Sequence, residues 1–205
     1  MKKEYAEVSR QNIAEALAKI AAIRTETYRD IEAVKTSGKY TDEHKKRVER
    51  DLTEAMYKDI APIAEKALAD VDALNEHFST AYDTPVSYKD KRFSEALAYI
   101  KEHGAAIRPE VADEIITDFQ GNRNALHQLQ RSFDENGAGA AALGAREAAK
   151  ALNTGKNDLG QIGMELHMQM RGGGSDDNLR HVSGMVGGLE IPAPYTSGTG
   201  TPAAE

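Results

Sequence analysis

The chain has 205 residues, which suits one or two domains, and a formal net charge of −7. Hydrophobic residues make up 40% of it and aromatic residues only 6%, a balance that favours helices with narrow apolar stripes over a β-sandwich or an α/β core. The chain has no cysteine, which excludes disulfides, thiolate metal sites and cysteine nucleophiles.

Residues 3–36 contain no Gly or Pro and are predicted to form one long helix. Two slots of its apolar heptad are occupied by Arg24 and Thr27, so we expect the stripe to shift there towards Ile23 and Tyr28. The residues that fill the stripe, and that we predict to contact another helix, are Ile13, Leu17, Ile20, Ile31 and Val34.

A second long helix is predicted over 42–81, where apolar residues recur every three or four positions. Gly38 is expected to take the left-handed conformation that ends the first helix, and Thr41 to cap the second. Pro62 is expected to kink the second helix. Two long helices joined by a short turn predict an antiparallel, coiled-coil-like hairpin over 3–81.

Shorter helices are predicted to follow, so that 1–136 form a helical body. One covers about 89–103, and Gly104 can end it. Another opens at Pro109 and extends to 135, either kinked or split at Gly121-Asn122. The fold class predicted is therefore all-α, with the hairpin followed by a second helical pair over 89–135.

The composition changes after residue 136, since 14 of the 17 glycines lie beyond it. Residues 137–171 are predicted to hold two weak Ala/Gly-rich helices, at 138–152 and 157–171. Residues 172–205 are predicted to be a Gly-rich irregular tail that is flexible or ordered by a partner.

This tail nevertheless contains a cluster of apolar residues within 179–191, which a disordered segment usually lacks. Two interpretations stay open: the cluster docks on a partner, or it packs back on the chain's own body. The candidate interaction residues there are Leu179, Val182, Val186, Leu189 and Ile191.

No pattern predicts a metal, a cofactor or a catalytic site. The six histidines share no ligand spacing. Met164, Met168 and Met170 flank His167 and offer copper(I) ligands, but methionines that fill gaps on a helix face are the favoured interpretation. The glycine clusters lack the Lys-Ser/Thr of a phosphate loop. We therefore expect a protein that is not an enzyme.

Hydropathy and charge predict whether the chain has a signal peptide and whether it binds a membrane or a nucleic acid. No stretch approaches the roughly 20 apolar residues of a membrane span, and no apolar core follows Met1-Lys2-Lys3, so neither a signal peptide nor a membrane partner is expected. The densest basic cluster, Lys45-Lys46-Arg47, is interleaved with acidic residues, which argues against a nucleic-acid partner.

The hairpin of 3–81, the second helical pair and the irregular tail together resemble the small acidic helical proteins that tailed bacteriophages encode beside their capsid genes, including scaffolding and minor virion proteins. The resemblance implies a structural or assembly role through helix–helix contacts, with protein partners that are other copies or other structural subunits. The C-terminus is neither basic nor helical by prediction, unlike many scaffolds, which favours the broader class of virion-associated proteins.

Two other functions stay open. The first is a cytosolic bacterial adaptor, chaperone or regulator, which needs the same helices. The second is an enzyme whose site lies within a helical bundle. The expected location is the cytoplasm, or a virion if a phage encodes the chain.

Overall fold

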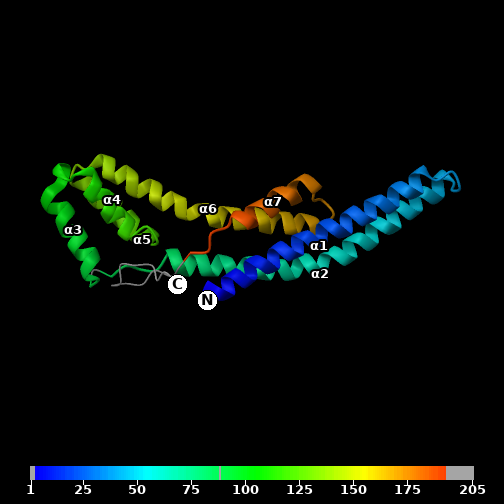
Figure 1. Cartoon of the computed structure of the whole chain (residues 1–205), viewed down its shortest axis with the longest axis horizontal. Helices are drawn as coiled ribbons and strands as arrows, with labels where there is room; N and C mark the ends of the chain where they lie inside the picture. Colours follow the sequence, from blue (N-terminus) through cyan, green and yellow to red (C-terminus); the bar gives the residue numbers. More distant parts are fainter. Residues whose placement is uncertain (1–2, 88, 193–205) are drawn as a thin grey trace. The chain divides into compact units, whose positions relative to one another are not determined.

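The computed structural model describes residues 3–87 and 89–192, and these residues are all-α, as predicted, with no strand among them. They form seven α-helices and one 3-10 turn (Figure 1). The elements are α1 (Lys3–Thr36), α2 (Asp42–Tyr82), α3 (Lys91–His103), η1 (Gly104–Ala106), α4 (Pro109–Asp118), α5 (Arg123–Glu135), α6 (Gly139–Met170) and α7 (Asp176–Gly188).

The described chain divides into two compact units. The long-helix unit comprises Glu4–Leu74 and Asp158–Leu189. The short-helix unit comprises Asn75–Asn157 together with residues 190–192, the described part of its C-terminal segment. Contacts thus group segments that are distant in sequence, whereas the predicted division at 136 and 171 followed composition alone.

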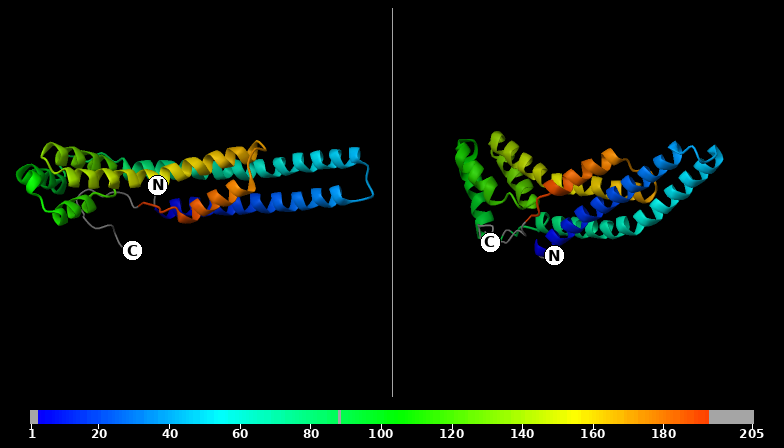
Figure 2. Two further views of the ribbon diagram at one scale, coloured as in Figure 1. Left: turned by 90° about the horizontal axis from the view of Figure 1, so that it is seen from above. Right: turned by 45° about the vertical axis from the view of Figure 1, so that its right-hand side comes forward.

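In the long-helix unit, α1 and the 42–74 part of α2 lie side by side and run antiparallel (Figures 1 and 2). Near the turn, Lys35 Nζ donates to Glu49 Oε1 at 2.6 Å, and near the other end Asn12 Nδ2 donates to Asp70 Oδ1 at 3.3 Å. A coiled-coil supercoil of this pair stays a prediction. The side chains buried on α1 and α2 in this unit include Ile13, Leu17, Ile20, Ile60, Ala64, Ala67 and Val71.

Most of the residues that were predicted to start or end a helix do so in the structure. Thr41 Oγ1 accepts from the His44 N–H at 3.3 Å, as expected of a cap. Gly104 ends α3 with a φ of 50°. Gly38 does not adopt the left-handed conformation, so that expectation was wrong; α1 ends at Thr36 without it. The helix α2 continues through Pro62, which is exposed.

Two helices differ from the prediction. One continuous α6 replaces the two weak helices expected within 137–171. The segment predicted to be an irregular tail contains α7, which Ser175 caps by accepting from the Asn178 N–H at 3.1 Å. Asp176 and Asp177 then lie in its first turn, where the helix dipole favours negative charge. The part of the tail beyond residue 192 lies outside the described residues.

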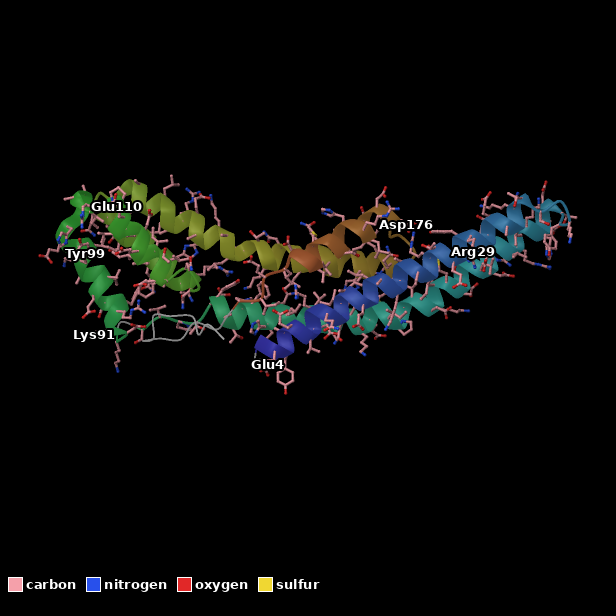
Figure 3. All side chains as sticks on the ribbon, in the orientation of Figure 1. Glu4, Arg29, Lys91, Tyr99, Glu110 and Asp176 are labelled. Carbon is pink, nitrogen blue, oxygen red and sulfur yellow. The ribbon has the colours of Figure 1, made fainter. Side chains whose placement is uncertain are left out.

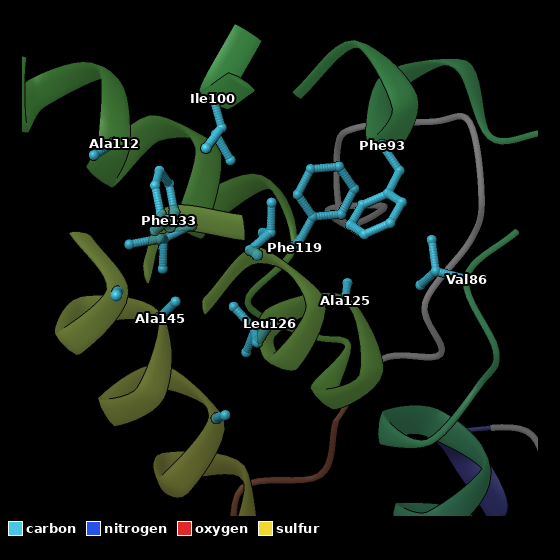
Figure 4. Close-up of a cluster of buried hydrophobic side chains, with 13 residues drawn as sticks. Val86, Phe93, Ile100, Ala112, Phe119, Ala125, Leu126, Phe133 and Ala145 are labelled. Atoms are coloured by element: carbon cyan, nitrogen blue, oxygen red, sulfur yellow. The ribbon is translucent and has the colours of Figure 1, made fainter. Parts of the chain in front are cut away.

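The short-helix unit has its own hydrophobic core, formed by α3, α4, α5 and the first half of α6 (Figure 4). Phe93 and Phe119 meet edge to face, with ring centroids 5.3 Å apart. Asn122 starts α5 by accepting from the Ala125 N–H at 2.9 Å, so the helix predicted from Pro109 to 135 is split at this residue. The other core residues are Val86, Ile100, Ala112, Ile116, Ala125, Leu126, Leu129, Phe133, Ala142, Ala145 and Ala149.

None of the helices in the described part of the chain is long and apolar enough to cross a membrane.

Candidate functional site

All but one of the predicted interaction residues are buried in the chain's own fold. Ile13, Leu17 and Ile20 are fully buried, Ile31 is 6% exposed and Val34 is half-buried. The predicted interaction residues of the C-terminal segment are each at most 9% exposed: Leu179, Val182, Val186, Leu189 and Ile191. Of the two interpretations of residues 179–191, the structure therefore shows the one in which the segment packs on the chain itself. A partner could reach these side chains only if the helices parted, and a role in contacts with another chain stays a prediction.

The long-helix unit contains a buried polar network centred on Arg24, which is only 4% exposed. Its guanidinium donates from Nε to Asp176 Oδ1 at 2.6 Å and from Nη1 to Gln169 Oε1 at 3.0 Å. It also donates from Nη2 to the Tyr28 hydroxyl at 2.9 Å. One side chain of α1 thereby binds both α6 and the first turn of α7, where Figure 3 labels Asp176.

The network continues along α6. Gln169 Nε2 donates to Glu165 Oε1 at 2.6 Å, and both residues are at most 5% exposed. A side chain at Gly174 would overlap the Gln169 amide, so a glycine is needed in this turn. Tyr57 also donates its hydroxyl proton to the Gly172 carbonyl at 3.0 Å. These contacts orient the turn from α6 to α7. Because the polar side chains of the network are hydrogen-bonded to one another, the network stabilises the fold.

A second polar cluster lies in the short-helix unit at the C-terminal end of α2. Arg123 Nη1 donates to Asp83 Oδ1 at 2.7 Å, and Lys156 Nζ donates to Asp83 Oδ2 at 2.9 Å. Next to it, burial raises the pKa of the Tyr82 hydroxyl, and the negative charge of Glu190 raises it further, against the opposing effect of Arg123. The paired Asp83 carboxylate joins α2, α5 and α6, which is a structural arrangement.

The cavities of the described structure include one within each unit. The larger, of about 400 Å³, lies between α3 and α5, and its polar lining includes Lys101, Gln128, Arg131 and Glu135. The other, of about 230 Å³, lies between α1 and α2 beside Pro62. Across the described residues, no three His, Cys, Asp or Glu side chains gather in a way that could hold a metal ion.

The feature that the structure adds is an exposed, uncharged face on the second half of α6. Met164 is 65% exposed and Met168, one turn later, is 42% exposed. We call this surface the Met164 face, and its members are Gly160, Gln161, Met164, His167 and Met168. The interpretation of Met164 as a gap filler was therefore wrong, because most of its side chain is exposed. Met168 is partly exposed, and its methyl group lies against Gly173 in the turn from α6 to α7.

One sequence signal was available for this face. Between Leu159 and Met170 the chain has a single charged residue, Glu165, and that residue is buried. A solvent-facing helix surface normally carries charged side chains, and 29% of this chain is charged. The sequence did not show which side of α6 faces the other helices, and the exposure of the methionines depends on that.

No protein-family model matches this sequence, and no curated protein or solved structure is significantly similar to it.

Proposed function

We propose that the chain is a structural or assembly protein that acts through contacts between its helix surfaces and other protein subunits. The observation that carries this proposal is the Met164 face. Large apolar side chains held in water on an otherwise uncharged surface gain free energy when a partner covers them. Methionine suits such a surface because its unbranched side chain adapts to the partner's shape.

The long helices support the same proposal. At about 1.5 Å per residue, the 34 residues of α1 span roughly 50 Å, which gives an extended surface for lateral contacts. Tyr5 and Val8 add a second exposed apolar pair on α1, at 62% and 54% exposure. The resemblance to minor virion proteins of tailed phages makes a phage particle the proposed setting. Detection of the chain by mass spectrometry in purified particles tests that part.

The proposal is tested by removing the apolar character of the Met164 face. We expect the wild-type chain, purified gently from the cells that encode it, to appear in native mass spectrometry as part of a larger assembly. The double variant Met164→Glu with Met168→Glu is expected to appear as the free chain, because burying two carboxylates in a contact is unfavourable.

The matched control is Leu143→Glu, which places a charge at another exposed apolar position of the same helix, 56% exposed in the wild type. This variant should keep the assembly, and circular dichroism should show the same helix content for all three proteins. A wild-type chain that is free of any assembly, or a double variant that retains it, would count against the proposed function.

A further inference from the structure

We infer that the cavity between α3 and α5 binds an acidic α-amino acid, a small molecule with two carboxylates and one ammonium group. The inference goes beyond the proposed function and does not depend on the Met164 face. It is carried by three features of the cavity wall: two cations without a counter-ion, one carboxylate without a counter-ion, and a buried amide oxygen without a hydrogen bond.

The cavity lies between two helices of the short-helix unit and opens to solvent. Leu97 and Lys101, one turn apart on α3, form one wall, and Asn136 lies at the end of the other. Its volume of about 400 Å³ falls within the range of about 300–1,000 Å³ that is typical of small-molecule sites. The wall on α5 consists of residues that step by three or four and therefore share a helix face: Gln128, Arg131, Ser132 and Glu135.

Two positive charges in this wall have no counter-ion in the part of the chain that the structure describes. Lys101 of α3 and Arg131 of α5 both line the cavity, and neither forms an ion pair with a described residue. A guanidinium matches a carboxylate in bidentate geometry, and an ammonium group binds one as a point charge. Because the two cations come from different helices, a ligand with two carboxylates can bridge them.

One negative charge completes the charged lining. Glu135 lies one turn after Arg131 on α5, a spacing at which opposite charges often pair. These two side chains form no ion pair with each other or with another described residue, so each is available to a ligand. Two positive charges and one negative charge are the complement of an acidic amino acid, which carries two carboxylates and one ammonium group at neutral pH. Such complementarity confers specificity.

Gln128 adds a polar group whose hydrogen bonding is incomplete. Its Oε1 is buried and has no hydrogen-bond partner among the described residues. Buried polar atoms are nearly always paired, since an unpaired acceptor costs free energy. The amide can accept a hydrogen bond from the ligand's ammonium group or donate one to a carboxylate. A ligand in the cavity would thus supply the hydrogen bond that the fold leaves unmade.

The first experiment compares the binding of L-glutamate and glutarate by isothermal titration calorimetry. Glutarate has the two carboxylates but lacks the ammonium group. The wild-type chain is expected to bind L-glutamate about tenfold more tightly than glutarate, because a charge-assisted hydrogen bond is lost with the ammonium group. Equal affinities for the two ligands, or no binding of L-glutamate and L-aspartate at millimolar concentration, would overturn the inference.

The second experiment repeats the titrations with variants of the cavity wall. Glu135→Gln is expected to abolish the preference for L-glutamate while it keeps glutarate binding, because only the ammonium group loses its partner. Arg131→Gln is expected to weaken the binding of both ligands about tenfold or more. A preference for L-glutamate that survives in Glu135→Gln would overturn the assignment of the ammonium group to this carboxylate.

Matched controls separate these effects from a general change of charge. Glu114→Gln and Arg108→Gln alter exposed residues of the same unit that do not line the cavity. Both should leave the two affinities unchanged. Circular dichroism should show the same helix content in all variants.

The third experiment locates the site by NMR on the isotopically labelled chain. L-Glutamate is expected to shift the amide signals of residues 97–101 and 128–136 and to leave those of the long-helix unit unchanged. Shifts centred on another part of the chain would overturn the inference even if calorimetry detects binding. Equal shifts with inorganic phosphate at the same concentration would show an unselective anion site and would also overturn it.

Discussion

At the scale of single residues, Arg24 shows how a charged side chain can occupy an apolar slot. The heptad pattern places Arg24 on the inner stripe of α1, and the sequence predicted that the stripe would move to Ile23 and Tyr28. The structure keeps Arg24 in the slot, 4% exposed, because α6 and α7 supply acceptors for two of its nitrogens and the Tyr28 hydroxyl of α1 accepts from the third. Tyr28 itself remains 38% exposed. A buried guanidinium is tolerated when its donors are paired.

We predict that Arg24→Met lowers the free energy of unfolding by about 3 kcal/mol, because it leaves Glu165 and Gln169 buried without the cation. Urea unfolding at neutral pH measures this loss. The control Arg29→Met changes an arginine that is labelled in Figure 3. Its side chain is 72% exposed, so the substitution should change stability by less than about 0.5 kcal/mol. Equal stability of the wild type and Arg24→Met would contradict a structural role for the network.

At the scale of elements, α6 shows why glycine content alone misleads. Gly155 and its neighbours suggested a break between two weak helices, since glycine inside a helix costs about 0.5–1 kcal/mol. The helix is nevertheless continuous, and a Cβ at Gly155 would overlap the ring of Phe78 of α2, which is 1% exposed. The glycine allows the backbone of α6 to approach that ring, and this tertiary contact offsets its low helix propensity.

We predict opposite effects for two Gly→Ala substitutions in helices. Gly155→Ala should destabilise the protein by about 1–3 kcal/mol, because the buried Phe78 ring must move. Gly184→Ala, in α7, should stabilise it by about 0.5–1 kcal/mol, since a Cβ there meets nothing within 4 Å. Chemical unfolding of both variants measures the difference. A stabilising effect of Gly155→Ala would show that the ring does not lie against the helix.

At the scale of the whole molecule, the C-terminal segment joins the fold that the earlier helices begin. The long-helix unit is built from Glu4–Leu74 and Asp158–Leu189, so helices far apart in sequence share one core. The inner face of α7 is formed by Leu179, Val182 and Val186, each at most 4% exposed. The C-terminal apolar cluster thus serves the chain's own fold, and the Met164 face remains exposed.

We predict that Val182→Asp lowers the melting temperature by about 5–10 °C, because an unpaired carboxylate in this core costs several kcal/mol. His181→Asp, at the exposed neighbouring position, should change it little. Thermal unfolding followed by circular dichroism compares the two. An unchanged melting temperature for Val182→Asp would show that α7 is not part of the folded core in solution.

The sequence by itself determined the all-α class and most helix ends. The helix predicted over 3–36 matches α1, and the one over 42–81 matches α2 to within one residue. These features are local: the apolar period lies within a helix, and the predicted cap at Thr41 binds an N–H group three residues away. The division into units, the continuity of α6 and the existence of α7 were not predicted.

Only the tertiary structure decided which side chains are buried. Leu179 and Met164 are both apolar residues of Gly-rich helices, yet one is 2% and the other 65% exposed. Arg24 and Arg29 are both arginines of α1, yet only Arg24 finds acceptors on other helices. Burial depends on which segments meet across more than a hundred residues of chain, and a periodic pattern contains no information on that pairing. The Met164 face, and with it the proposed function, follows from that pairing.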